Sequence, residues 1–245
     1  MDENLQNFWK LYYERFSNDR MIRSKHNPLR EYEDEFVDGP VLELGCGQSC
    51  FLVELSKSGK EIYAVDNESS QLNFLHKRIT EYGPADQDKI HLLNLTVLRD
   101  QLPERVFSIV IMSDIMHFFG LEDAKTLMEQ IISRTAQGSL VYLRVHSKKH
   151  SYNDSLDPSI HDYFKHFFSV EDLDKLFDEA YFECLVCSET RQFTKSKHEL
   201  DLELEWLSSM MDEQGITDPE ERDQAIRENS SDIVDAWISC IYRRK

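Results

Sequence analysis

Residues 41–49 read VLELGCGQS, a short apolar segment that leads directly into a glycine-rich turn. The apolar residues predict a buried strand, and the residues that follow, 50–57, predict a helix. Gly45 and Gly47 permit positive φ angles and let a bound molecule approach the backbone closely. In an open α/β sheet, ligands bind beyond the carboxyl ends of the strands. This stretch therefore predicts both the start of an α/β sheet and the place of a ligand site.

The segments around this stretch continue an alternation of strands and helices. We predict strands at residues 41–44, 61–65, 90–95, 106–112, 139–145, 182–187 and 236–242. We predict helices at residues 50–57, 69–82, 121–135, with Gly138 as the stop signal, and 169–178, opened by a capping box at Ser169 and Asp172. This alternation predicts a mostly parallel sheet with helices on both faces. Residues 96–105 are short for a crossover, so we expect a stunted helix there.

Composition and charge restrict the class of protein. The chain has 245 residues, of which 40% are hydrophobic, enough for a substantial core. No apolar run approaches the ~20 residues that span a bilayer, and the first ten residues do not resemble a secretory signal, so we expect a cytoplasmic protein without a membrane partner. The net charge of −18 repels phosphate backbones, so we expect no nucleic-acid partner. Cys184 and Cys187 lie in a predicted strand and are expected to be small buried residues.

Domain organisation is suggested by two segments outside the regular alternation. Residues 1–36 mix aromatic and charged residues and predict an N-terminal helical cap, so that the main domain is 37–245. Within it, residues 191–235 form an acidic insert: between 199 and 235 there are 13 acidic and two basic residues. Leu200, Leu204, Leu207 and Met211 recur there at helical spacing. The insert could be a lid, a homodimer surface or additional cover for the core.

Two carboxylates flank the glycine-rich turn. Glu43 comes just before it, and Asp66 ends the second predicted strand, where a carboxylate can accept hydrogen bonds from ribose hydroxyls. A dinucleotide site requires G-x-G-x-x-G, but the third position here is Cys50. Glu43 would also repel a pyrophosphate and attract an ammonium group. An NAD(P)-dependent oxidoreductase is therefore the less favoured reading of the turn.

The motifs together resemble a known family. The segment from Glu43 to Gly47, the carboxylate of Asp66 and residues 107–119, which read FSIVIMSDIMHFF, resemble class I S-adenosylmethionine-dependent methyltransferases, among them small bacterial enzymes of the tellurite-resistance type. The resemblance covers about residues 37–145, and the last two predicted strands are similar to the hairpin that closes the family's sheet. It implies an α/β, Rossmann-like, seven-stranded mostly parallel sheet with a C-terminal antiparallel hairpin. It also implies an enzyme that uses S-adenosyl-L-methionine and a small-molecule acceptor.

The resemblance implies a role for individual residues of the cofactor site. The methionine part would be held by Glu43, Gly45, Cys46 and Gly47, the ribose by Asp66 with Asn67 beside it, the adenine by Asn94 and Leu95, and the amino end by the backbone of Met112. Three positions depart from the family pattern: Ser49 replaces a glycine, Ser108 replaces an aspartate, and Asn94 stands where an aspartate is usual, with Thr96 as the other candidate.

Histidines supply the candidates for acid–base chemistry. His117 follows the fourth predicted strand, where a catalytic base could stand, although a packed, hydrogen-bonded histidine is the competing interpretation. His146, His150, His161 and His166 cluster further along the chain and could line an acceptor pocket or lie in solvent. Their spacing does not match a metal-ligand pattern, so we expect no metal site. A relative that binds the cofactor without turnover, and a basic protein as the acceptor, remain alternatives.

Overall fold

The computed structural model describes residue 11 and residues 27–82, 86–192, 197–229 and 235–245. The chain divides into two compact units. The larger contains His26–Arg191 and Ala236–Lys245, and the smaller contains Met1–Lys25 and Gln192–Asp235. The sheet with its glycine-rich turn belongs to the larger unit, so this unit carries the candidate site.

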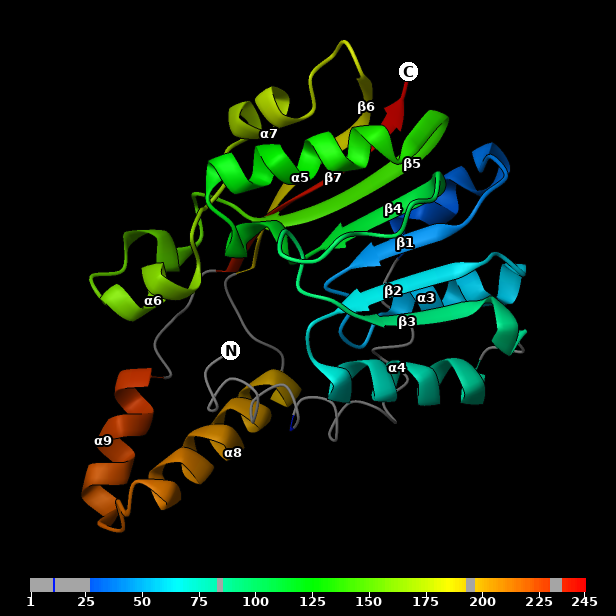
Figure 1. Cartoon of the computed structure of the whole chain (residues 1–245). Helices are drawn as coiled ribbons and strands as arrows, with labels where there is room; N and C mark the ends of the chain where they lie inside the picture. The colour runs from blue at the N-terminus through cyan, green and yellow to red at the C-terminus, as the bar shows by residue number, and fades with distance from the viewer. Residues whose placement is uncertain (1–10, 12–26, 83–85, 193–196, 230–234) are drawn as a thin grey trace. The chain divides into compact units, whose positions relative to one another are not determined.

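A seven-stranded sheet in the order β3-β2-β1-β4-β5-β7-β6 forms the centre of the larger unit. Strands β1 to β5 pair in parallel where they are neighbours, and β7 runs antiparallel to β5. In Figure 1 the arrowheads of β1, β2, β4 and β5 point the same way, which brings the carboxyl ends of these strands to one edge. The strands are β1 (Val41–Leu44), β2 (Ile62–Asp66), β3 (Ile90–Asn94), β4 (Phe107–Ser113), β5 (Thr135–His146), β6 (Phe182–Gln192) and β7 (Asp235–Arg244). The predicted Rossmann-like sheet with its antiparallel end is confirmed.

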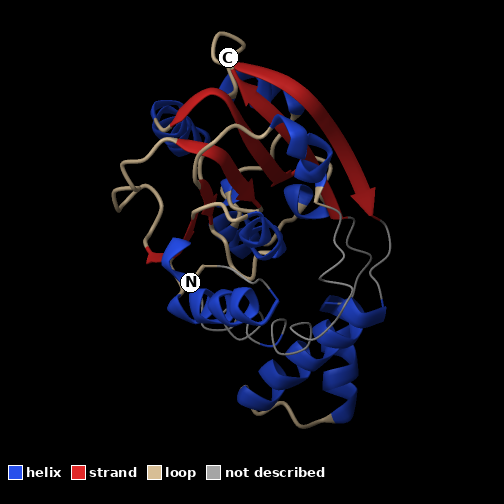
Figure 2. Cartoon of the chain, turned by 90° about the vertical axis from the view of Figure 1, so that its right-hand side faces the viewer, coloured by secondary structure: helices blue, strands red, loops and turns tan. Residues whose placement is uncertain are grey.

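Helices cover both faces of this sheet, as Figures 1 and 2 show. One core cluster includes Leu127 of α5 and Leu173 of α7, and the other includes Leu52 of α3 and Leu75 of α4. Strand β1 is buried throughout because both of its faces are covered, which explains its uninterrupted apolar pattern. The helices are α3 (Cys50–Leu55), α4 (Ser69–Tyr82), α5 (Leu121–Ser133), α6 (Pro158–Tyr163) and α7 (Val170–Leu176), with 3-10 turns η1 (Pro28–Glu35), η2 (Ser56–Ser58), η3 (Gln87–Lys89), η4 (Met116–Phe118) and η5 (Ser151–Asp154).

Strand β5 differs from its prediction at its start. We predicted a helix to residue 135 and a strand from 139, but α5 ends at Ser133 and β5 begins at Thr135. Gly138 has a φ of +86° inside the strand, and the register with β4 shifts beside it. The hydroxyl of Ser139 accepts a hydrogen bond from the N–H of Ala136 and donates one to the carbonyl of Phe107. The glycine therefore permits a bulge in the strand and does not end the helix.

The link between β3 and β4 also differs from its prediction. The expected stunted helix is absent from residues 96–105, all of which the structure describes. A turn stands in its place, closed by a 2.7 Å hydrogen bond from the N–H of Thr96 to Asp100 Oδ2. Val97 and Leu102 point into the core, and Leu98 takes a positive φ of 72°. The turn therefore buries apolar side chains without the length that a crossover helix needs.

Other boundaries move by a few residues. Ser169 and Asp172 form the predicted capping box, but α7 ends at Leu176 and not at residue 178. The predicted helix 50–57 is divided between α3 and η2, while β6 and β7 extend beyond the predicted residues. Cys184 on β6 is exposed, which contradicts its predicted burial, and Cys187 is only half-buried.

The smaller unit contains α8 (Lys197–Glu213) and α9 (Pro219–Asn229), both within the predicted insert. Arg222 of α9 joins them, because its guanidinium donates to Ser208 Oγ at 2.7 Å and pairs with Asp212 at 2.6 Å. The buried apolar residues are Leu202, Leu207 and Met211, whereas the predicted Leu200 and Leu204 are 40% exposed. Among the described residues no helix combines the length and apolarity needed to cross a bilayer.

Candidate cofactor site

The turn after β1 depends on its two glycines for different reasons. Gly45 has a φ of +61° and Gly47 a φ of +46°, both in the left-handed region that favours glycine. A Cβ on Gly45 would lie 2.7 Å from Ile115 Cδ1, whereas a Cβ on Gly47 would meet no atom within 4 Å. The N–H of Cys46 donates to the carbonyl of Val65 at 3.0 Å, which fixes the turn against β2. The turn is therefore packed on one side at Gly45 and open at Gly47.

Glu43 is a buried carboxyl group at the carboxyl end of β1, with 2% of its surface exposed. Burial raises its pKa to about 8, against the hydrogen bond from Ser49, and the negative charges of Asp114 and Asp66 raise it further. At neutral pH the side chain is therefore mostly protonated. A cation that bound beside it would favour the ionised form and release the proton.

Ser49 explains why the third glycine of the motif is dispensable. Its hydroxyl donates to Glu43 Oε2 and accepts a hydrogen bond of 3.0 Å from the N–H of Leu52, so the same side chain caps α3. A serine before a helix is a common N-cap signal in a sequence. The substitution therefore keeps the turn joined to both the strand and the helix.

Asp66 ties the end of β2 to the glycine-rich turn. Its Oδ2 accepts a 2.8 Å hydrogen bond from the N–H of Gly47, and its Oδ1 accepts one of 2.9 Å from the N–H of Glu68. Burial raises the pKa of this carboxyl group, although both backbone hydrogen bonds oppose the shift. The neighbouring Asn67 has an exposed side chain. Asp66 thus has a structural role in addition to its predicted contact with a ribose.

The end of β3 lies beside Asp66, its partner in the sheet register. The side-chain N–H of Asn94 and the backbone N–H of Leu95 both donate to the carbonyl of Asp66 at 3.1 Å. Within the described part of the chain, no donor contacts the amide oxygen of Asn94. This oxygen is therefore available to accept a hydrogen bond. The alternative, Thr96, has its backbone N–H bound to Asp100.

Asp114, just beyond β4, was missed from the sequence. It has a φ of +60°, which a non-glycine residue rarely adopts, and it binds the Nε of Arg144 on β5 at 2.7 Å through Oδ1. Burial opposes ionisation of Asp114, but the charge and hydrogen bonds of Arg144 outweigh it and lower the pKa. An acid at a strand end was the signal that identified Asp66, and it could have identified Asp114.

The side chain of Met112, near the end of β4, lies wholly inside the core.

His117, the candidate base, is 2% exposed. Burial lowers its pKa to about 4, and the charge of Asp114 only partly compensates. Its Nδ1 accepts a 3.4 Å hydrogen bond from the N–H of His146, and the two rings stack with centroids 3.9 Å apart. The imidazole is therefore neutral, and in this geometry its proton is on Nε2.

The other four predicted histidines separate into two groups. His150 continues the stack, with its ring 4.5 Å from that of His146. His166 pairs with Asp172 at 3.3 Å, and His161 contacts the carbonyl of Ser155 at 3.0 Å. His146 and His150 therefore form one stack of rings with His117, whereas His166 contacts His117 through the backbone, its N–H donating to the His117 carbonyl at 3.3 Å.

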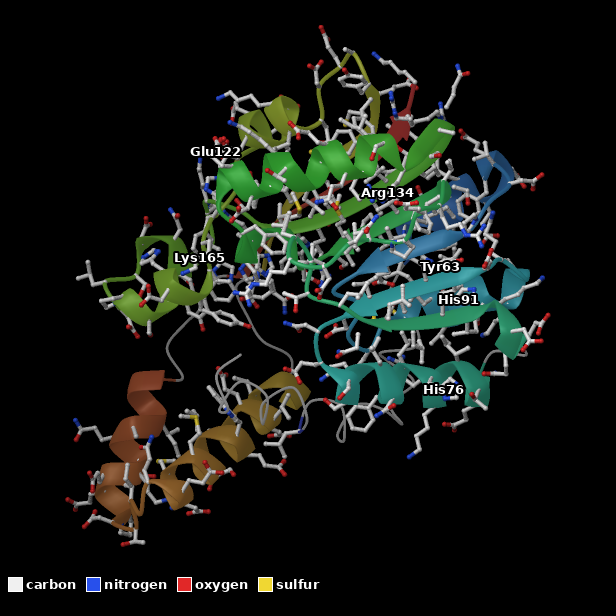
Figure 3. All side chains as sticks on the ribbon, in the orientation of Figure 1. Tyr63, His76, His91, Glu122, Arg134 and Lys165 are labelled. Atoms are coloured by element: carbon white, nitrogen blue, oxygen red, sulfur yellow. The ribbon has the colours of Figure 1, made fainter. Side chains whose placement is uncertain are left out.

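A separate polar group lies near the amino ends of β2 and β3, at the other end of the strands from the candidate site. Tyr63 donates to Glu61 at 2.9 Å and stacks on His91 with centroids 4.4 Å apart. In Figure 3, Tyr63 and His91 lie away from the edge near which Lys165 appears. The backbone N–H of Lys165 donates to the carbonyl of His117 at 2.9 Å. The candidate site is thus at the carboxyl edge.

Comparisons with known proteins agree with this geometry. Residues 41–138 match the family model described as "Methyltransferase domain". No curated protein sequence matches the chain significantly. Part of the chain thus matches a family model, although no individual curated sequence matches it significantly.

Solved structures similar to this chain share its fold. They include TehB from Haemophilus influenzae (TM-score 0.63, 16% identity, 94% of this chain and 66% of that one), SAM-dependent methyltransferases from Methanosarcina mazei (0.57, 11%, 89% and 98%) and coclaurine N-methyltransferase bound to N-methylheliamine and SAH (0.57, 12%, 98% and 87%). This chain spans slightly less than two thirds of the length of TehB. Residues 41–138 are therefore similar to a methyltransferase domain, and the chain has the fold of these solved structures.

Proposed function

We propose that the protein transfers a methyl group from S-adenosylmethionine to a small-molecule acceptor. The observation that carries this proposal is the buried carboxyl group of Glu43 beside a glycine-rich turn that is open at Gly47. A cation such as an ammonium group would favour the ionised form of this carboxyl group and pair with it, whereas a pyrophosphate would keep it protonated and gain no ion pair. This difference favours S-adenosylmethionine over a dinucleotide, and therefore methyl transfer over hydride transfer.

Each part of the cofactor has a proposed partner at the carboxyl edge. Glu43 and the backbone of residues 45–47 hold the methionine part, and the backbone of Met112 borders its amino end. Asp66 holds the ribose with its two carboxylate oxygens, which also accept hydrogen bonds from the N–H groups of Gly47 and Glu68, and Asn67 lies beside it. The amide oxygen of Asn94 accepts the adenine amino group, with Leu95 next to it. These contacts use strand ends that the sheet register already brings together.

The cofactor supplies a methyl group already activated on a sulfonium. The protein then has to align the acceptor, exclude water and, for some acceptors, remove a proton. His117 is our candidate for that base, because it is neutral and lies three residues beyond Asp114. Its depressed pKa and stacked ring make it a weak base. The role therefore suits an acceptor that loses its proton readily.

The domain boundaries remain predictions. The proposed cap, residues 1–36, lies largely outside the described residues, although η1 is described and Leu29 is fully buried. The insert at 191–235 contains α8 and α9, and we propose that it serves as a lid or a homodimer surface. A cytoplasmic location and the absence of a nucleic-acid partner remain expectations from composition.

The test is calorimetric titration with S-adenosylmethionine, S-adenosylhomocysteine and NADH. We expect micromolar binding of both sulfur ligands and none of NADH. Asp66→Ala should abolish binding, whereas Asp123→Ala, which removes an exposed acid on α5, should leave it unchanged. Binding of NADH alone, or of no ligand, would overturn the proposal. Cofactor binding without methyl transfer to any acceptor in a broad screen would favour the non-catalytic alternative. If an acceptor is methylated, the turnover of His117→Gln tests whether the imidazole acts as the base.

A further inference from the structure

One face of β5 and β7 changes character near the carboxyl end of β5. Tyr142 and Ile241 are buried on this face, and the ring of Phe51 from α3 lies 5.1 Å from that of Tyr142. Toward the carboxyl end of β5 the side chains on this face become polar or aromatic and half-buried. Four of them form what we call the polar β5–β7 surface: Arg144, His146, Trp237 and Ser239.

The strand register assembles this surface. Arg144 is opposite Ser239, and His146 is opposite Trp237. Arg144 and Trp237 are therefore diagonal neighbours, within reach of each other on one face. The guanidinium carbon lies 6.0 Å from the centre of the indole ring, at the outer limit of cation–π contacts. The surface thus combines the cation of Arg144 with the indole ring of Trp237. The ring of His146 stacks on those of His117 and His150.

Arg144 is held in a fixed orientation. Its Nε contacts both oxygens of Asp114 at 2.7 and 2.9 Å, and Nη2 contacts Oδ2. Among the residues that the structure describes, none accepts a hydrogen bond from Nη1. The side chain is still 31% exposed. Asp114 therefore fixes one edge of the guanidinium and leaves another edge for a ligand.

Asp114 adopts a positive φ of 60° to reach this position. Such a backbone costs of order 1–3 kcal/mol, and it persists where the surroundings require it. The pair also lies at the carboxyl edge, where Glu43 and Asp66 stand. An oriented guanidinium at a ligand-binding edge recognises a planar oxyanion, because its parallel N–H groups match two oxygens.

We propose that Arg144 determines acceptor specificity by binding a carboxylate, and that Trp237 contacts an aromatic ring attached to it. The acceptor class is therefore an aromatic carboxylic acid. This inference rests on the proposed methyl transfer for its biological meaning, but the binding site itself can be tested alone. Arg144 is a specificity residue here and takes no part in moving the methyl group.

The experiment is calorimetric titration of the full chain with benzoate and with benzamide, each with and without saturating S-adenosylhomocysteine. We expect benzoate to bind about tenfold more tightly than benzamide, because a hydrogen bond between two charged groups increases the affinity by about one factor of ten. In Arg144→Gln the benzoate affinity should fall to that of benzamide, while the benzamide affinity stays. A merely structural arginine would weaken both ligands together.

Arg243→Gln is the matched control. Arg243 lies on the same strand pair opposite Leu140, is also 31% exposed, and pairs with Glu35 and Glu183. We expect it to keep the preference for benzoate. If Arg144→Gln does not fold, Arg144→Lys retains the charge beside Asp114 and should weaken benzoate by about threefold, because the ammonium lacks the planar fork.

Equal affinity for the two probes, or a preference that survives the loss of Arg144, would overturn the inference. Failure of S-adenosylhomocysteine to bind would overturn the proposed function instead. The titrations without that ligand would still decide whether Arg144 binds the carboxylate.

Discussion

Glu43 shows how the fold changes the chemistry of a single residue. A carboxyl group in water ionises near pH 4, but this one is enclosed by the sheet, and the carboxylates of Asp66 and Asp114 lie near it. Among these three acids, Asp114 has a cationic partner, Arg144. Within the part of the chain that the structure describes, neither Glu43 nor Asp66 forms an ion pair, and a ligand with an ammonium group would favour the ionised form of Glu43 and pair with it.

The binding of S-adenosylhomocysteine should depend on pH through Glu43. The carboxyl group is protonated below about pH 8 and must ionise to hold the ligand's ammonium group. We expect the affinity to rise with pH between about 6 and 8, by up to about tenfold per unit, with release of a proton. Calorimetry in buffers of different ionisation enthalpy measures both quantities. Glu43→Gln should bind weakly and show little of this dependence; an unchanged pH profile in that variant would assign the titration to another group.

The same pKa shift affects folding stability with a definite sign. A pKa raised on folding contributes stability that is present below the unfolded value and is lost as pH rises through the folded value. Glu43 therefore destabilises the ligand-free protein progressively from about pH 4.5 to about pH 8. The protein gives up stability at neutral pH to keep this carboxyl group in its site, and a bound cation would restore part of it.

At the level of secondary-structure elements, local signals predicted most of the sheet and pairing between distant strands determined the rest. The glycine-rich turn and the acid of Asp66 were visible because each is a short pattern at a strand end. The early start of β5 was missed because Gly138 after a helical pattern reads as a helix stop, whereas the structure uses it in a bulge. The pair of Asp114 and Arg144 could not be predicted because it depends on the register of β4 with β5, across 30 residues.

The turn after β1 gives an element-scale prediction about stability. Gly45→Ala places a side chain in the left-handed region, which costs about 1–2 kcal/mol, and also forces Ile115 to move. Gly47→Ala has the backbone cost alone, because no atom lies within 4 Å of its Cβ. We expect the free energy of unfolding to fall by about 1–2 kcal/mol in Gly47→Ala and by more in Gly45→Ala.

Chemical denaturation measures both values, and Gly59→Ala is the control. Gly59 has a φ of +74° and open space at its Cβ, but it lies outside the site, at the end of η2. It should resemble Gly47→Ala in stability and the wild type in cofactor affinity. Equal losses for Gly45→Ala and Gly47→Ala would show that the contact with Ile115 relaxes without cost.

At the scale of the whole molecule, the insert enters and leaves the larger unit at neighbouring strands. It connects β6 to β7, and these strands are adjacent in the sheet. The larger unit contains the candidate cofactor residues and both core clusters of the sheet. Because the connected strands are adjacent, a short linker can replace the insert with little cost in loop closure.

A variant that begins at His26 and joins Arg191 to Ala236 through a short Gly-Ser linker should therefore fold. We expect cooperative thermal unfolding and affinity for S-adenosylhomocysteine within about twofold of the full chain, since the proposed contacts all lie in the retained unit. If the insert is a lid, methyl transfer should fall while cofactor binding remains; if it is a homodimer surface, the mass in solution should halve. Loss of cofactor binding in a folded variant would instead place part of the cofactor site in the smaller unit, and Glu43, Asp66 and Asn94 would then be insufficient to hold the ligand.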